Sequence, residues 1–214
     1  GQLTLLIKKC AYLVTNDTGT MHIAAAVGTN IIGLFFAHAH PFETGPYSEG
    51  NLIFQARIPC APCSYGVECN NVVCIEKVSP EYLLTMIKTH QESKEWQLPE
   101  TMKGLKEVNI YSTCLSNDRR LLLRPLIKHP LTLNDIFREI YSNYWLKILG
   151  KKESSAINSF DNDQINFDDY DCDNVFEQID KVNEKISVLT VLERLANQGM
   201  CDAEEISQLF VKNE

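Results

Sequence analysis

Two short apolar runs, separated by a turn and a helix of small residues, constrain the fold more than any other feature. Residues 11–15 read AYLVT and residues 30–37 read NIIGLFFA, and continuous apolar runs of this length are typical of buried strands. Between them, residues 21–27 predict a helix that Gly28 ends. The order strand, helix, strand predicts a parallel sheet covered on both faces, and therefore an α/β fold.

Three features continue this pattern toward the middle of the chain. Residues 52–54 predict a short third strand. Residues 58–77 form a loop rich in cysteine. Residues 80–90 predict a helix with Ser79 as its cap and proline at its first position.

A hairpin and a helix are predicted next. Residues 108–115 and 120–127 are two apolar runs around a polar turn, which indicates a β-hairpin. Thr132 and Asp135 have the spacing of a capping box. Apolar residues over 136–149 recur at helical spacing, and this face is predicted to lie in a core.

Length and charge limit the class of protein. The chain has 214 residues, a mean hydropathy of -0.16 and 44% hydrophobic residues, typical of a soluble globular protein. Its formal net charge of -8 argues against a general nucleic-acid-binding function. The charge is uneven, at -3 over residues 1–100, +4 over 101–150 and -9 over 151–214.

The turn between the first strand and its helix has the chemistry of an anion site. It reads TNDTGTMHIAAAVG, and ligands of parallel sheets bind at the carboxyl ends of the strands. Free N–H groups and the dipole at a helix start attract phosphate. Gly19 lets phosphate approach, Thr18 and Thr20 add hydroxyl groups, and Asp17 suits sugar hydroxyls better than phosphate. In the alternative interpretation, Asp17 or Thr18 only caps the helix.

The wider string resembles the C-terminal domain of the bacterial heptosyltransferases, glycosyltransferase family 9. That family shows a D-[ST]-G-x-x-H-x-A-A-A-x-G segment, then a strand, then a loop that ends in T-G-P-Y. The matching positions here are Asp17, Thr18, Gly19, His22, Ala24, Ala25, Ala26, Gly28, Thr44, Gly45, Pro46 and Tyr47. The resemblance covers roughly residues 1–90.

This resemblance implies part of the Rossmann-like C-terminal domain of a GT-B glycosyltransferase, which holds the nucleotide-sugar donor, ADP-heptose in the best known members. By motif, Thr18 and Gly19 contact the diphosphate, with Thr20 beside them. Asp17 holds the sugar hydroxyls, and His22 lines the same site. Transfer in this family needs no metal and inverts the anomeric centre.

The resemblance also implies what lies outside this chain. A base from the N-terminal domain activates the acceptor hydroxyl, so we expect no catalytic base here and a chain that is inactive alone, with a sticky sheet edge. The expected partners are an ADP-sugar and a lipopolysaccharide-core-type acceptor, with no nucleic acid. The expected location is the cytoplasm, with peripheral contact at the inner face of the inner membrane.

Four cysteines in fifteen residues form a second candidate site. Cys60, Cys63, Cys69 and Cys74 have the spacing C-x2-C-x5-C-x4-C. Such a quartet is able to bind zinc or an iron–sulfur cluster, although the second pair departs from the C-x-x-C of zinc ribbons. Reduced thiols packed in a loop are the alternative.

The composition predicts four segments. They are residues 1–98, the sugar-nucleotide domain; 99–150, a hairpin with a helix; 151–175, an acidic flexible linker; and 176–214, a helical hairpin with a break at Gly199. The second function hypothesis is a non-enzymatic module, with a metal site in the cysteine loop and a helical tail that binds a partner.

Overall fold

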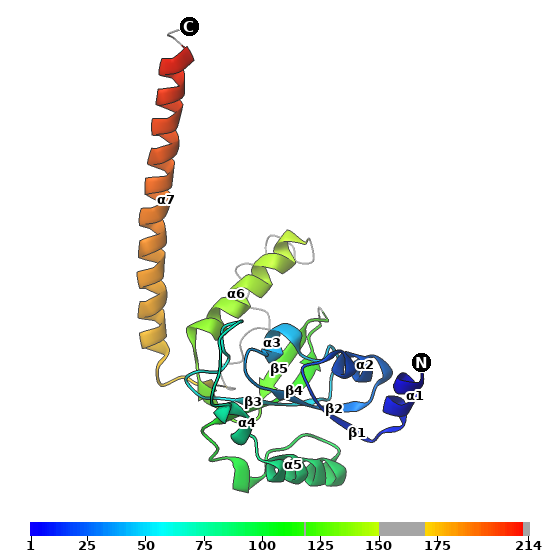
Figure 1. Ribbon diagram of the computed structural model, residues 1–214. Helices are drawn as coiled ribbons and strands as arrows, with labels where there is room; N and C mark the ends of the chain where they lie inside the picture. The colour runs from blue at the N-terminus through cyan, green and yellow to red at the C-terminus, as the bar shows by residue number, and fades with distance from the viewer. Residues whose placement is uncertain (118, 150–169, 212–214) are drawn as a thin grey trace. The chain divides into compact units, whose positions relative to one another are not determined.

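The computed structural model describes residues 1–117, 119–149 and 170–211, shown as coloured ribbon in Figure 1. The chain divides into two compact units. The first comprises Gly1–His129 and Leu146–Tyr170, and the second comprises Pro130–Trp145 and Asp171–Glu214. The first unit carries the α/β fold that the sequence predicts.

One sheet of five strands organises the first unit. In spatial order its strands are β1 (Tyr12–Asn16), β2 (Asn30–Phe35), β3 (Leu52–Ala56), β4 (Val108–Leu115) and β5 (Leu121–Pro125). β1, β2 and β3 pair in parallel, and β4 pairs antiparallel with both β3 and β5, so four of the five strands run in one direction. The predicted hairpin is confirmed, and it continues the sheet that the earlier strands begin.

Helices cover both faces of this sheet (Figure 1). The helices of the first unit are α1 (Gln2–Lys9), α2 (Gly19–Val27), α3 (Pro41–Thr44), α4 (Val73–Glu76), α5 (Pro80–Ser93) and the 3-10 helix η1 (Glu100–Met102). Side chains alternate along the strands, so one apolar cluster joins Ile31 and Ile53 to Met21 of α2. The other cluster joins Ile32 and Phe54 to α5 and η1. The predicted layer on each face is thus confirmed.

Local turn chemistry sets the helix ends as the sequence predicts. α2 ends at Gly28, whose φ of 74° lies in the left-handed region that glycine adopts without strain. α5 begins after Ser79, whose hydroxyl accepts a hydrogen bond of 3.2 Å from the Glu81 amide.

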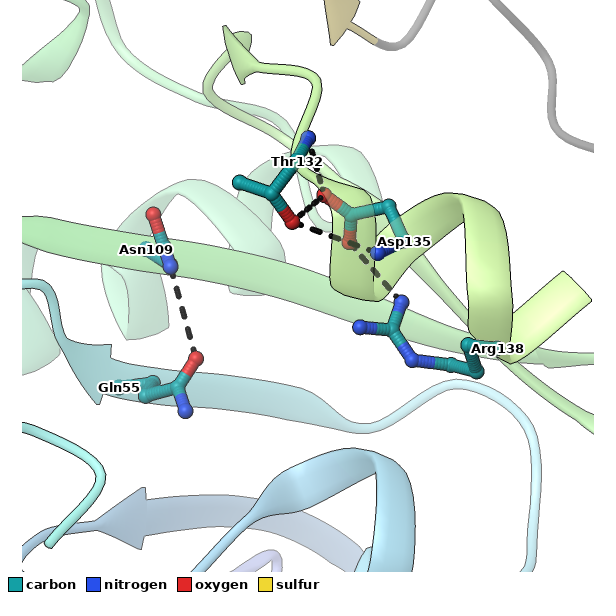
Figure 2. Close-up of polar contacts among 5 residues, drawn as sticks. All are labelled: Gln55, Asn109, Thr132, Asp135 and Arg138. Carbon is teal, nitrogen blue, oxygen red and sulfur yellow. Dashed lines mark hydrogen bonds and ion pairs between the residues drawn. The ribbon is translucent and has the colours of Figure 1, made fainter. Parts of the chain in front are cut away.

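Figure 2 shows two sets of polar side-chain contacts, one between neighbouring strands and one at the start of a helix. Gln55 of β3 accepts a hydrogen bond of 3.4 Å from Asn109 of β4. In the second unit, α6 (Leu133–Ile148) begins at the predicted capping box. There the Thr132 amide donates to the Asp135 carboxylate at 2.9 Å, and Arg138 forms an ion pair with the same carboxylate at 3.0 Å.

The apolar face predicted over residues 136–149 does not lie in a core. Ile140, Tyr141, Tyr144 and Trp145 of α6 are each more than half exposed. The helical spacing correctly predicted the helix, but spacing alone does not determine what covers an apolar face.

The predicted helical hairpin over residues 176–214 is wrong. A single helix, α7, runs from Val175 to Val211. Glycine in a helix interior costs about 1 kcal/mol without breaking it, and Gly199 lies inside α7. Asp202, one turn further on, accepts a hydrogen bond of 2.8 Å from Gln198 within the helix.

The remaining described elements are a two-stranded ladder of β6 (His129–Pro130) and β7 (Tyr170–Asp171). Most of the predicted linker over 151–175 lies outside the described residues. None of the helices in the described ranges has both the length and the hydropathy that crossing a membrane requires.

A cluster of three rings predicts how stability depends on pH. Tyr12 Oη lies 2.8 Å from His90 Nδ1, and the His90 ring stacks on Trp96 with centroids 4.0 Å apart. Desolvation, and then the charge of Lys94, lowers the pKa of His90. The folded state therefore resists protonation of His90, whereas the unfolded chain takes up this proton below about pH 6.5.

We predict that the free energy of unfolding decreases as the pH falls from about 7.5 to about 5.5. His90→Gln should lose less stability over this range than the parent, as measured by urea unfolding at both pH values. His22→Gln, at an exposed histidine of α2, is the matched control and should behave like the parent. Equal losses in the parent and in His90→Gln would contradict the assignment.

Candidate functional site

The predicted anion site lies at the carboxyl end of β1. Asp17 follows the strand directly, and Thr18 is the N-cap residue of α2 with an extended backbone, at φ -149° and ψ 164°. The Thr18 side chain makes no capping hydrogen bond. The first N–H groups of α2 therefore receive no hydrogen bond from the side chain of their N-cap residue and keep their affinity for an acceptor.

Asp17 is held from a distant part of the chain. The Thr44 hydroxyl donates a hydrogen bond of 2.6 Å to Asp17 Oδ2. Thr44 ends α3, in the segment that follows β2, and β2 is the parallel neighbour of β1 in the sheet. Parallel strands bring their carboxyl ends to one edge. A side-chain hydrogen bond thus joins the two halves of the motif, Asp-Thr-Gly and Thr-Gly-Pro-Tyr.

The Thr-Gly-Pro-Tyr segment is itself fixed tightly. Gly45 is buried, and a Cβ atom there would lie 2.3 Å from the Pro41 carbonyl oxygen, so only glycine fits this approach. Two residues on, the Tyr47 hydroxyl donates a hydrogen bond of 2.5 Å to the carbonyl oxygen of Arg119, in the turn between β4 and β5. The segment that holds Asp17 is therefore fixed by close packing at Gly45 and by the hydrogen bond of Tyr47.

The motif residues at the start of α2 face open space or solvent, whereas Ala24, further along the helix, is buried. Thr18, Gly19 and His22 are exposed, and Thr20 is half-buried. A Cβ atom on Gly19 would meet no atom within 4 Å. The start of α2 is consequently accessible to a ligand, with one carboxylate beside it.

The two histidines of the neighbouring loop have separate surroundings. The His38 ring packs edge-on against Tyr65, with centroids 5.5 Å apart. The His40 ring lies 5.6 Å from that of Phe42, at the start of α3. They line the loop as separate polar side chains, as expected of a pair at i and i+2 on an extended loop, where alternate side chains point in opposite directions.

The cysteine loop is attached to this same region. The Cys63 amide donates a hydrogen bond of 2.8 Å to the Ala37 carbonyl, just after β2. Cys63 Sγ donates to the Cys60 carbonyl at 3.1 Å, and Cys69 Sγ donates to the Asn71 carbonyl at 3.2 Å. These thiols act as hydrogen-bond donors to the backbone, which requires that they keep their protons.

The pKa of Cys63 agrees with its role as a hydrogen-bond donor. Desolvation, followed by the charges of Cys60, Cys69 and Cys74, raises the pKa of the Cys63 thiol. Among the described residues, no group of three or more histidine, cysteine or acidic side chains is arranged to hold a metal ion. Metal binding by the quartet stays a prediction that needs its own test.

The sequence predicts which residues form the anion site but not how they are held. It marks Thr44 only as a motif position, whereas in the structure Thr44 is the hydrogen-bond partner of Asp17. The Arg119 carbonyl was not considered, because a backbone acceptor leaves no mark on a side-chain pattern. The sequence predicts a basic patch at a solvated edge of the hairpin, formed by Arg119, Arg120, Arg124, Lys128 and His129. His129 is instead buried beside the rings of Tyr111 and Tyr170.

Comparison with known proteins identifies the segment that carries this site. Residues 1–72 match the model of glycosyltransferase family 9 (heptosyltransferase). This segment is similar to glycosyltransferase family 9. The match contains Asp17, Thr44 and the start of α2, so these parts of the site lie within residues 1–72, the family 9 segment.

A curated relative supports the assignment. The chain is 31% identical over 87 residues to the lipopolysaccharide core heptosyltransferase OpsX of Haemophilus influenzae. The aligned region is 41% of this chain and 25% of the relative, so the chain spans about a quarter of that protein's length. No solved structure matches the chain.

The cysteine quartet leads to a prediction about metal content. Because the Cys63 and Cys69 thiols donate to backbone carbonyls, we expect less than one zinc per chain in protein purified without added metal. Inductively coupled plasma mass spectrometry measures this directly. A stoichiometric zinc or iron content that disappears in the double variant Cys60→Ser, Cys63→Ser would contradict the expectation and show that the loop rearranges around a metal.

Proposed function

We propose that this chain supplies the donor site of an inverting glycosyltransferase of the GT-B fold. The donor is a nucleotide diphosphate sugar, ADP-heptose by the family resemblance, and the acceptor is of the lipopolysaccharide-core type. One observation carries the proposal. The start of α2 has no side-chain cap and lies beside a carboxylate that Thr44 holds in place, within the family 9 segment.

The start of α2 suits the diphosphate. An uncapped helix start presents N–H groups and a partial positive charge, and each charge-assisted hydrogen bond to phosphate contributes about 1.5–3 kcal/mol. Gly19 and Thr20 belong to the first turn, and the Thr18 hydroxyl is exposed beside them. These three residues bind the phosphate oxygens in our proposal, and His22, exposed on the same helix, lines the site.

Asp17 suits the sugar. A carboxylate repels phosphate but accepts hydrogen bonds from sugar hydroxyls. Thr44 engages Oδ2, and Oδ1 has no hydrogen-bond partner within the described part of the chain. A carboxylate held at one oxygen keeps a fixed orientation, so its other oxygen can select one arrangement of hydroxyl groups.

In this proposal, the catalytic base lies in a part of the enzyme other than this chain. We propose that the base that activates the acceptor comes from the N-terminal domain of the enzyme, and that transfer needs no metal. The chain alone is then able to bind the donor without transferring the sugar. Because the proposed acceptor is of the lipopolysaccharide-core type, the proposed enzyme acts at the cytoplasmic face of the inner membrane and contacts that membrane peripherally.

Gly19→Val tests the phosphate site. The substituted side chain would lie over the N–H groups at the start of α2, and we predict that the affinity for ADP falls tenfold to a thousandfold, which is about the loss of one or two charge-assisted hydrogen bonds. Isothermal titration calorimetry of this chain with ADP measures the effect. The backbone of Gly19 lies outside the left-handed region and its surroundings are open, so the fold should tolerate valine.

Two further variants make the test selective. Gly104→Val is the matched control, because Gly104 is equally open, also has an ordinary backbone conformation and lies far from the motif in the sequence. It should bind ADP like the parent. Asp17→Ala should spare ADP while weakening the ADP-sugar. Unchanged ADP binding by a well-folded Gly19→Val variant would show that the start of α2 is not the phosphate site.

A further inference from the structure

α7 is a helix without the packing that usually stabilises one. It has 37 residues, and every described side chain from Asn183 to Asp202 is exposed. Isolated helices are only marginally stable in water, and most helical stability in proteins comes from packing of an apolar face. α7 also has a strongly apolar surface, so its exposure suggests that it has a partner.

The apolar residues of α7 follow the spacing of a coiled coil. Val175, Ile179, Val182, Ile186 and Leu189 succeed one another at alternating intervals of four and three residues. Leu192 flanks this stripe, and Met200 continues it at the same spacing. The large apolar side chains of the stripe between 179 and 200 are 46% to 63% exposed; they are Ile179, Ile186, Leu189, Leu192 and Met200.

The shape of the stripe also fits the knobs-into-holes packing of a coiled coil. A hollow on α7 is lined by Ile186, Leu189, Thr190, Leu192, Glu193 and Ala196. The members at 186, 189, 190 and 193 have the spacing of the four-residue hole that receives a side chain in coiled coils. The same stripe carries protruding leucine and isoleucine side chains, so one copy of α7 provides both the knobs and the holes.

The size and charge of this face fit a second copy. The stripe from Ile179 to Met200 is about 33 Å long and α7 is roughly 11 Å across, so one side offers on the order of 360 Å² per copy, which is the size of weak, reversible interfaces. Flanking the stripe, Gln178, Asn183, Thr190 and Asn197 are neutral, with Lys185 the one basic neighbour. Two copies therefore meet without rows of like charge.

We propose that α7 pairs with α7 of a second copy of this chain, along the stripe from Ile179 to Met200. The two helices run in opposite directions in this pair. Glu193 is the charged residue of the hollow, and antiparallel pairing keeps the Glu193 side chains of the two copies apart. Two-fold pairing of identical chains is the commonest form of protein assembly. This inference does not depend on the proposed donor site, because α7 lies outside the residues that match family 9.

Leu189→Glu tests the pairing. The substitution sets a charge into the stripe of both copies, and we expect the dissociation constant of the dimer to rise by at least about 100-fold. Sedimentation equilibrium of the whole chain over roughly 1–100 µM measures it. Val191→Glu is the matched control, since Val191 is an exposed valine on the opposite side of α7 from Ile186 and Leu189, and it should leave the dimer intact.

Circular dichroism and a second substitution complete the test. Glu193→Leu removes the charge from the hollow and should tighten the dimer. At concentrations where the parent is a dimer, Leu189→Glu should have less helix than the parent. At concentrations where the parent is a monomer, the two should have the same helix content. A parent chain that stays monomeric over this range, or a dimer weakened equally by Leu189→Glu and Val191→Glu, would overturn the proposal.

Discussion

The parallel pairing of β1 with β2 is the constraint on which the site depends. Their register sets Tyr12 opposite Asn30 and Asn16 opposite Leu34, so the two strands end side by side. The next residue after β1 is Asp17, and the chain after β2 turns through α3 to Thr44. A shift of this register by one residue would turn the side chains of β1 to the other face of the sheet, and the bond from Thr44 to Asp17 would be lost.

Packing on both faces fixes that register. Ile31 and Ile32 are consecutive in β2 and are both fully buried, one in each apolar cluster. Burial of each such side chain contributes about 1.5–3 kcal/mol, and slippage by one residue would exchange the two clusters. The open start of α2 is therefore supported by a rigid scaffold, while Gly45 and Tyr47 fix the loop beside it.

Local patterns predicted most of the fold, because the forces that set them act over a few residues. The strands, the end of α2 at Gly28, the cap at Ser79 and the box of Thr132 with Asp135 each depend on neighbours in sequence. The bond between Asp17 and Thr44 spans 27 residues and follows from the sheet order, which the pattern does not contain.

The two wrong predictions, a buried face on α6 and a break at Gly199, also concern contacts that are not local in sequence. The apolar spacing of α6 correctly predicted a helix, but spacing does not reveal whether a face meets a core, a partner or water. Gly199 suggested a break in the last helix, yet the neighbouring residues favour helix strongly enough to continue through it. In both cases the missing information is what the apolar surface packs against, and this depends on other parts of the chain or on a second molecule.

An amide NMR titration of the ¹⁵N-labelled chain with ADP tests the central claim most directly, because it observes the N–H groups at the start of α2. The account predicts that the Gly19 and Thr20 amide resonances shift and saturate together, with smaller shifts at Thr44, while Gly104 stays unchanged. Saturable shifts that gather elsewhere, or no shift of Gly19 and Thr20 at millimolar ADP, would contradict it.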